Sequence, residues 1–217
     1  MINYSQNNEQ DTILTYLNNY DITSGTLLDI GSYDGETYSN TRAIMIKYPK
    51  WKGIFVEPSS HSFVKLFNLY QNEPRRAELI NLLVTTEDEL NNEVLVEFYD
   101  TPTQSPASSI DIKCVNRFVN KVDNFGASID PRKVITAKVG LKQLFLKFKN
   151  TPFEFINVDI EGGSAKLVLQ DWFNPLDYGC KLICIEHDNM ISDLQNKFNN
   201  LGYKTISYTG ENLIFGL

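Results

Sequence analysis

The chain contains few cysteines and histidines, and this scarcity excludes two classes of site. Of its 217 residues, three are cysteine and two are histidine. An odd and sparse set of cysteines is not the framework of a disulfide-stapled secreted domain. Cys180 and Cys184 fall on one expected strand, roughly 13 Å apart, which is too far for a disulfide. With His61 and His187 as the two histidines, we expect no histidine-rich zinc site.

Long apolar runs and an excess of basic residues are also missing. No run of about 18 apolar residues occurs, so we expect no membrane-spanning helix. The opening residues MINYSQNNEQ lack the apolar region of an export signal. The 27 acidic residues outnumber the 20 basic ones and give a net charge of −7, whereas a dedicated nucleic-acid-binding protein needs a basic face. We therefore expect a cytoplasmic protein that binds neither membranes nor nucleic acids.

The sequence does contain enough apolar residues for a well-packed domain. Hydrophobic residues make up 42% of the chain and aromatic residues 12%, which is too much for a disordered chain. We predict a single domain over residues 1–217, with an N-terminal helical extension at 1–24. A lid-like insertion is expected at 100–133, where prolines and turn residues interrupt the pattern of strands. The sequence does not determine the oligomeric state.

Apolar runs of strand length alternate with segments of helical periodicity. Strands are predicted at 26–30, 53–57, 78–84, 93–99, 133–139, 153–160, 181–186, 203–208 and 213–217. Helices are predicted before residue 21 and at 36–48, 63–70, 110–122, 141–148, 164–172 and 189–201. Strands that are apolar on both faces and separated by helices predict an α/β fold, with a mostly parallel sheet covered on both faces. The last two strands predict a C-terminal antiparallel hairpin.

Acidic residues stand at the carboxyl ends of four predicted strands. They are Asp29 in the first strand, Glu57 followed by Pro58 in the second, Asp159 and Glu161 at the strand near residue 158, and Glu186, followed by His187 and Asp188, at the next. Ligands of open parallel sheets bind at this edge, near the point where the strand order reverses. Carboxylates crowded together repel one another unless a ligand or cation offsets their charge. We therefore expect the binding site at this edge.

The loop after the first strand indicates which class of nucleotide-like ligand the site would bind. Gly31 and Gly35 have the spacing G-x-x-x-G, without the middle glycine that lets a dinucleotide pyrophosphate approach the backbone. Asp29 would also repel a pyrophosphate. Glu57 lies 22 residues beyond Gly35, where an acid suits the hydroxyls of a ribose. A nucleoside with an ammonium-bearing tail and no phosphate satisfies both features, and S-adenosylmethionine is such a molecule.

The order of motifs resembles that of FkbM-type methyltransferases. The motifs are LLDIGSYDGETYSN, IFVEPSSHSF, SSI, FINVDIEGGS, LICIEHD and GYKTISYTGENLIFG, over residues 26–217. The resemblance implies a Rossmann-like class I fold, which ends its sheet with an antiparallel strand, and S-adenosylmethionine-dependent activity, mostly O-methylation. The chain departs from the family pattern at Tyr33, Asn157, Ser164 and Lys142, where Asn, Lys, Glu and Asp are usual.

The resemblance also implies which residues hold the cofactor. Asp29 and the loop after it would cradle the methionine portion, Glu57 would hold the ribose, and the backbone near residues 84–85 would border the adenine. Ser109, with Ser108, would close over the site. The residues assigned to cofactor binding are Asp29, Gly31, Ser32, Tyr33, Gly35, Glu57, Pro58, Val84, Thr85, Ser109 and Asp159.

Methyl transfer to a hydroxyl requires alignment of the acceptor, together with a base or a metal ion. The catalytic candidates are Asp159, Glu161 and His187, the last because histidine titrates near neutral pH. The alternative for His187 is a hydrogen-bonded loop residue. Mg²⁺ is a candidate cofactor, and its candidate ligands are Asp159, Glu161 and Glu186. The alternative is that these acids cap the following turn and helix.

One stretch of the chain is basic despite the overall acidity. Residues 132–149 contain no acid and six bases, which are Arg132, Lys133, Lys138, Lys142, Lys147 and Lys149. Such a stretch is usually a solvent-exposed surface. The functional alternative is a basic patch that binds an anionic acceptor such as a glycan.

The expected function is methyl transfer from S-adenosylmethionine to a hydroxyl of a saccharide or other small hydroxylated acceptor. An anionic glycan is one candidate for this acceptor. Two alternatives stay open. One is a non-catalytic module that keeps the fold for binding. The other is an NAD(P)-dependent oxidoreductase, which the missing middle glycine and the charge of Asp29 disfavour.

Overall fold

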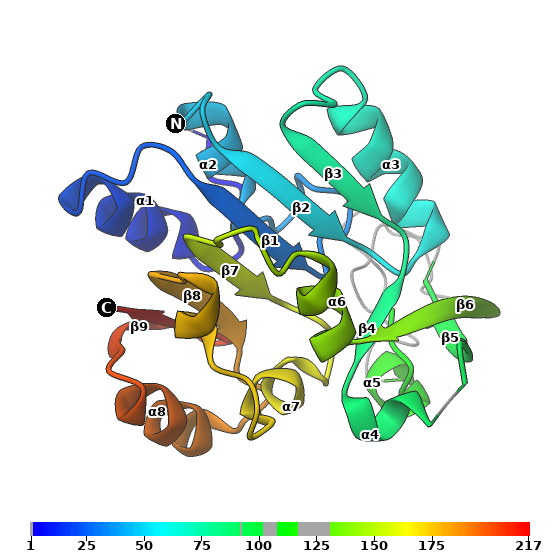
Figure 1. Cartoon of the computed structure of the whole chain (residues 1–217). Coiled ribbons are helices and arrows are strands. Elements are labelled where there is room, and N and C mark those ends of the chain that lie inside the picture. The colour runs from blue at the N-terminus through cyan, green and yellow to red at the C-terminus, as the bar shows by residue number, and fades with distance from the viewer. Residues whose placement is uncertain (1, 92, 102–107, 117–130) are drawn as a thin grey trace.

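A computed structural model describes residues 2–91, 93–101, 108–116 and 131–217. Its centre is a seven-stranded sheet (Figure 1). In spatial order the strands are β3 (Ala77–Ile80), β2 (Lys52–Val56), β1 (Thr26–Ile30), β7 (Phe155–Val158), β8 (Leu182–Glu186), β10 (Asn212–Gly216) and β9 (Lys204–Tyr208). The first five strands in this order run parallel, and β10 is antiparallel to both β8 and β9. The predicted α/β architecture, with a C-terminal hairpin, is confirmed.

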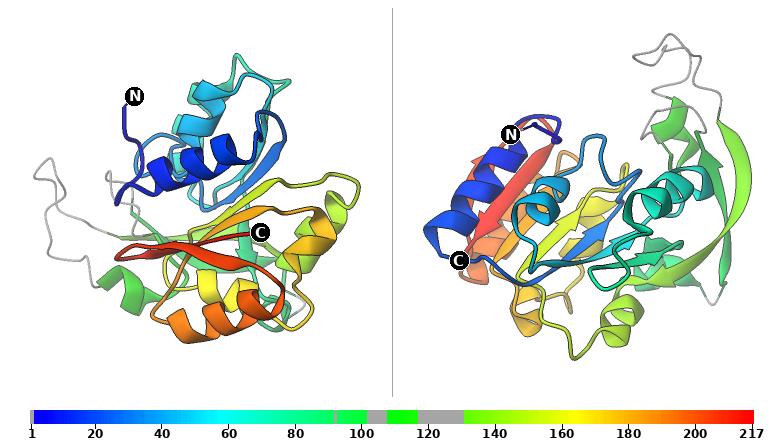
Figure 2. Two further views of the ribbon diagram at one scale, coloured as in Figure 1. Left: turned by 90° about the vertical axis from the view of Figure 1, so that its left-hand side faces the viewer. Right: turned by 90° about the horizontal axis from the view of Figure 1, so that it is seen from above.

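Helices cover both faces of the sheet because its strands are apolar on both sides. One face carries α1 (Glu9–Asn19), α2 (Arg42–Lys47) and α3 (Ser60–Tyr70), and the other carries α6 (Leu141–Lys147), α7 (Ser164–Leu169) and α8 (Ile191–Asn200). The left view of Figure 2 shows blue helices on one side of the sheet and yellow and orange helices on the other. Neighbouring residues of one strand serve opposite faces: Leu27 packs with α1 and α2, whereas Leu28 packs with α6 and α7.

A second sheet lies beyond the carboxyl ends of the parallel strands. It has the order β4 (Leu83–Thr85), β6 (Arg132–Gly140) and β5 (Leu95–Asp100). In Figure 1 the arrowheads of β1 and β2 point toward it. This sheet therefore forms a wall beside the edge at which ligands are expected.

The prediction of one strand at 78–84 was wrong. The chain pairs with β2 as far as Ile80, and it then leaves the main sheet and pairs with β6 from Leu83. Asn81 lies at the break, and its side-chain Nδ2 donates to the main-chain carbonyl of Glu57 over 2.7 Å. An asparagine side chain that binds the backbone in this way replaces the next bond of the sheet ladder.

The predicted helix at 36–48 begins later, at Arg42. The preceding residues form a loop, because Asp34 accepts hydrogen bonds from the amides of Glu36 and Thr37, and Tyr38 has a φ of 55°. Ser39 then accepts from the amide of Arg42 through its side-chain oxygen. In the 100–133 insertion, the helix α5 covers Ile112–Asn116, and residues 117–122 of the predicted helix lie outside the described residues.

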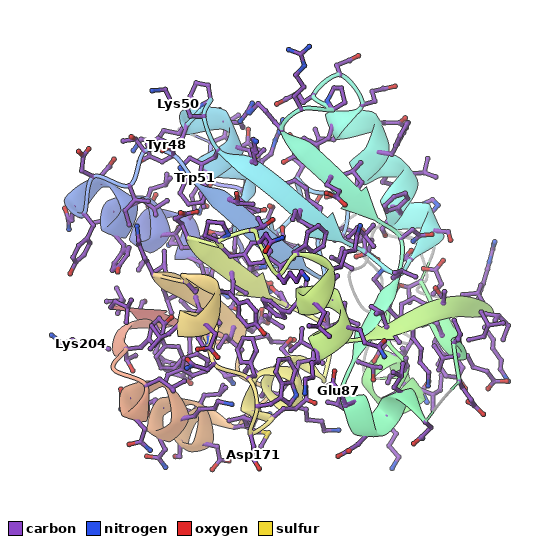
Figure 3. The ribbon with its side chains drawn as sticks, in the orientation of Figure 1. Tyr48, Lys50, Trp51, Glu87, Asp171 and Lys204 are labelled. Atoms are coloured by element: carbon purple, nitrogen blue, oxygen red, sulfur yellow. The ribbon has the colours of Figure 1, made fainter. Side chains whose placement is uncertain are left out.

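Glu87 joins the second sheet to the helices of the main sheet. It opens the short helix α4 (Glu87–Leu90) and is labelled in Figure 3. Its Oε1 accepts from the amide of Lys142 at the start of α6 over 2.7 Å, and its Oε2 accepts from Trp172 Nε1 over 3.1 Å. A carboxylate that is distant in the sequence therefore caps the start of α6.

Among the described residues, no helix is both long enough and apolar enough to cross a bilayer.

Candidate functional site

A cavity of about 730 Å³ lies at the carboxyl ends of the parallel strands. This volume is typical of small-molecule sites. It opens at the switch point, because β1 pairs with β2 on one side and with β7 on the other. Every residue that the sequence assigned to cofactor binding or catalysis lines this cavity, except Gly35.

Gly31 and Gly35 are required for packing. Gly31 has a φ of +87°, and a Cβ there would overlap the main-chain carbonyl of Asp159. Gly35 has a φ of +78°, and a Cβ there would press on Leu66 and Leu69 of α3. Gly31 thus lets the loops after β1 and β7 touch beneath the cavity, whereas Gly35 seats its loop on α3 and lies off the cavity wall.

Asp29 is held by a small buried network. Its Oδ2 accepts from the Thr41 hydroxyl over 2.6 Å, and its Oδ1 accepts from Asn157 Nδ2 over 2.8 Å. The side chain is 2% exposed, and burial raises the pKa of Asp29 to about 6, against these two hydrogen bonds. Asn157 therefore gives Asp29 a neutral donor and no compensating positive charge.

Glu57 is fixed by two backbone amides. Its Oε2 accepts from the amide of Tyr33 over 2.8 Å, and its Oε1 accepts from the amide of Ser59 over 2.7 Å. Burial, and to a lesser extent the charges of Asp100 and Asp29, raise the pKa of Glu57 to about 8. Each carboxylate oxygen keeps a further acceptor site, so the group can still receive hydroxyl donors from a ligand.

Ser32 ties the first loop to the second strand. Its amide donates to the carbonyl of Val56 over 3.1 Å, and its hydroxyl donates to the carbonyl of Asp29 over 2.8 Å. The amide of Val56 donates to the same hydroxyl over 3.1 Å. The loop is therefore positioned by its own bonds before any ligand arrives.

Further acidic side chains line the cavity at the ends of β7 and β8. Asp159 follows β7 and Glu186 ends β8, the neighbouring strand. Burial and the charge of Glu161 raise the pKa of Asp159 well above its ordinary range. Burial and the charges of Asp159, Glu161 and Asp188 raise the pKa of Glu186 to about 10. These groups cannot all ionise at neutral pH without a compensating charge.

His187 has no free ring nitrogen. Its Nδ1 accepts from the amide of Asn189 over 3.0 Å, and its Nε2 lies 3.1 Å from the carbonyl of Gly210. Since a carbonyl only accepts, this pair of bonds places a proton on Nε2. The prediction that His187 acts as a catalytic base is therefore not supported by this geometry, and the alternative of a hydrogen-bonded loop histidine describes it.

The remaining predicted residues border the cavity from the second sheet and the insertion. Ser109 donates through its hydroxyl to the carbonyl of Glu161 over 3.0 Å, and it forms a bridge with Tyr99 of β5. Val84 and Thr85 belong to β4, and the Thr85 hydroxyl donates to Glu89 over 2.8 Å. Pro58 lines the cavity beside Glu57.

The basic stretch 132–149 does not form one open patch. Lys133 pairs with Glu97 over 2.6 Å, and Lys147 pairs with Glu78 over 3.3 Å. Lys138 is buried and donates to the carbonyl of Glu89 over 2.8 Å. None of the six bases lines the cavity, whose one lysine among the described residues is Lys166. The hypothesis of an anion-receiving patch therefore finds no support in the arrangement.

Asn40, Thr41 and Gln6 were not predicted as site residues. Asn40 and Gln6 line the cavity, and Thr41 binds Asp29 from the same loop as Asn40. For Asn40 and Thr41, the signal was the polar run after Gly35, which the helix prediction obscured. For Gln6 no local signal existed, because its contact with Glu211 joins the two ends of the chain.

The described residues contain no group of three or more His, Cys, Asp or Glu side chains arranged to hold a metal ion. Asp159, Glu161 and Glu186 face one cavity without forming such a group.

No family model matches the chain, and no curated protein matches it.

Proposed function

We propose that the protein is a class I methyltransferase that transfers a methyl group from S-adenosylmethionine to a hydroxyl of a saccharide or other small hydroxylated acceptor. The observation that carries this proposal is the meeting of Asp29 and Glu57 on one wall of the switch-point cavity. The resemblance to FkbM-type enzymes assigns these two acids to the methionine portion and the ribose. The antiparallel β10 beside β8 matches the class I sheet ending that the resemblance implies.

The acceptor atoms of this wall fit the proposed cofactor. Asp29 offers a carboxylate near the loop that would cradle the ammonium of the methionine portion. Glu57 keeps one acceptor site on each oxygen, as two ribose hydroxyls require. Hydroxyl donors favour the ionised form of Glu57, which offsets the burial of its charge. The missing middle glycine and the charge of Asp29 disfavour the pyrophosphate of a dinucleotide.

The bound cofactor would supply an electrophilic methyl group on a sulfonium. The acceptor oxygen forms the new bond to carbon, the carbon–sulfur bond breaks, and its electron pair stays on sulfur. Asp159 takes the hydroxyl proton in this proposal, because its raised pKa makes it a stronger base than an ordinary aspartate. In the ligand-free protein, burial and the neighbouring acids raise the pKa of Glu186 to about 10, and a positive charge bound beside it would favour its ionised form.

The test is calorimetric titration with S-adenosylhomocysteine, which lacks the methyl group. We expect 1:1 binding, weakened about tenfold or more by Glu57→Gln, since a charged hydrogen bond contributes about 1.5–3 kcal/mol. The matched control is Glu93→Gln, an exposed acid away from the cavity. Absence of binding by the wild-type protein would refute the proposal.

Turnover distinguishes an enzyme from a binding module. The protein is incubated with S-adenosylmethionine and pools of hydroxylated compounds, and release of S-adenosylhomocysteine is measured by mass spectrometry. We expect this release to depend on the acceptor and to be abolished in Asp159→Asn. Calorimetry of the same variant measures its cofactor affinity separately, because Asp159 is also assigned to cofactor binding. Binding without turnover on every pool would favour the non-catalytic alternative.

A further inference from the structure

The acceptor side of the cavity carries far more negative than positive charge. Its acids come from the ends of β7 and β8 and from the hairpin turn, and they are Asp159, Glu161, Glu186, Asp188 and Glu211. The one basic residue among the described lining residues is Lys166, which is exposed on α7. The charge of Lys166 acts on Asp188, whereas Asp159 and Glu186 take part in none of the described ion pairs.

The hydrogen bonds on this wall leave acceptor capacity in excess. Glu186 Oε2 receives the Ser164 hydroxyl over 3.1 Å, and Asp188 Oδ2 receives the amide of Ala165 over 2.9 Å. A carboxylate can accept about four hydrogen bonds. The raised pKa values of Asp159 and Glu186 follow from the same crowding, which a cation would relieve.

Asn40 provides an independent sign of a missing donor. Its side chain is 3% exposed and lines the cavity, and its Nδ2 donates to Asn157 Oδ1 over 3.2 Å. Its Oδ1 has no hydrogen-bond partner among the described residues. Asn157 lies on β7, Asp159 follows two residues later beyond the end of that strand, and both residues line the cavity. A buried acceptor without a donor is costly, and a ligand N–H would satisfy it.

The proposed cofactor does not account for all of this charge. It carries a sulfonium, an ammonium and a carboxylate, and hence a net charge of +1. Asp29 and Glu57, at the carboxyl ends of β1 and β2, are the acids proposed for its ammonium and hydroxyls. Resting on the proposed function, we infer that the acceptor is itself a cation, a small hydroxylated amine whose protonated amino group faces Asp159, Glu186 and Glu211. An anionic glycan, by contrast, would be repelled from this wall.

Three probes of similar size test the charge of the acceptor without assuming its identity. Serinol, glycerol and glycerate share a three-carbon hydroxylated frame and carry charges of +1, 0 and −1 at neutral pH. Each is titrated by NMR against the protein saturated with S-adenosylhomocysteine. We expect serinol to bind about tenfold more tightly than glycerol, and glycerate more weakly than both. Equal affinities, preference for glycerate, or no binding of serinol would overturn the inference.

Variants locate the preference on the acidic wall. Glu186→Gln should reduce the serinol-to-glycerol ratio severalfold, and Glu93→Gln, away from the cavity, should leave it unchanged. Glu211→Gln serves as a second variant, because its exposed side chain can change without disturbing the core. An unchanged ratio in both cavity variants would overturn the inference.

Two further arms separate this inference from other outcomes. Titration with MgCl₂ tests whether a metal ion is the missing cation. Displacement of serinol by one Mg²⁺ bound per protein would overturn the assignment of an amine. Calorimetry with S-adenosylhomocysteine alone reports on the proposed function. Cofactor binding without a serinol preference refutes only the charge of the acceptor, whereas loss of cofactor binding refutes the proposed function itself.

Discussion

Asn157 on β7 donates its Nδ2–H to Asp29 on β1 over 2.8 Å, and the two residues are direct partners in the parallel register of these strands. Asp29 is thereby held at the switch point by an amide. A neutral donor orients the carboxylate but does not neutralise it, so the pKa of Asp29 stays raised by burial.

Replacing Asn157 with leucine should destabilise the protein by about 1–3 kcal/mol, because Asp29 Oδ1 and Asn40 Nδ2 both lose a buried partner. Urea denaturation at pH 7 measures the change in the free energy of unfolding. The matched control is Asn199→Leu, an exposed position on α8, which should change stability by less than about 0.5 kcal/mol. Equal effects of the two substitutions would show that the buried pair contributes nothing specific.

The free protein should become less stable as the pH rises from about 4.5 to 8. Burial raises the pKa of Glu57 from about 4.5 to about 8, so the folded state holds a proton that the unfolded state has released over this range. Stability is therefore greatest below the ordinary pKa and is lost as the pH rises toward the raised one. One such group contributes a slope of at most about 1.4 kcal/mol per pH unit.

Glu57→Gln removes that group and should flatten the slope. Urea unfolding at pH 5, 6, 7 and 8 gives the slope for each protein, and Glu93→Gln, which removes an exposed carboxyl, provides the comparison. The change in slope is the relevant readout, since the glutamine also disturbs the bonds from Tyr33 and Ser59. A Glu57→Gln slope equal to that of the wild type would contradict the assignment.

Gly31→Ala should cost much more than Gly202→Ala. Both glycines have a left-handed backbone, with φ of +87° and +92°, so both alanines carry the conformational penalty of about 1–2 kcal/mol. At Gly202 nothing lies within 4 Å of a new Cβ, whereas at Gly31 the Cβ overlaps the carbonyl of Asp159. Denaturation should show the added cost, and S-adenosylhomocysteine affinity should fall in Gly31→Ala alone. Similar losses in the two variants would mean that the loops can part freely.

The pattern of apolar runs was sufficient to predict the sheet, because strands buried on both faces must be apolar throughout. Leu27 and Leu28 illustrate this, since each packs into a different core. The break at Asn81 was missed because ELINLLV is apolar on both sides of it, and one side-chain bond to Glu57 decides where the chain leaves the sheet. Apolar periodicity does not record such a bond.

The sequence was sufficient to predict that acidic residues at the strand ends line the site. It was not sufficient to predict their hydrogen-bond partners. Glu57 and Asp159 stand directly after or at the end of apolar runs, where a sheet places ligand contacts. The role of His187 depends on the carbonyl of Gly210, which comes from a hairpin far along the chain. Only the folded arrangement shows that both ring nitrogens are engaged.

Glu9 should control the order of the hairpin turn beside the cavity. Its buried carboxylate accepts from the Thr209 hydroxyl over 2.8 Å and from Asn212 Nδ2 over 3.1 Å, so α1 is fastened to the turn that carries Gly210 and Glu211. Glu9→Leu removes the acceptor of Asn212 Nδ2 and the shorter of the two bonds of the Thr209 hydroxyl, and it should cost about 1–3 kcal/mol. Amide hydrogen exchange of the turn should also rise, since its local opening no longer requires breaking these bonds.

The comparison variant is Asp11→Leu, an exposed acid in the same first turn of α1, which tests for any general effect on the helix. It should leave exchange at residues 209–212 as in the wild type. Glu9→Gln keeps one oxygen acceptor and should restore part of the protection. If exchange in the turn does not change in Glu9→Leu, then the bonds between Thr209, Asn212 and the backbone hold the turn without α1, and the fastening role of Glu9 is wrong.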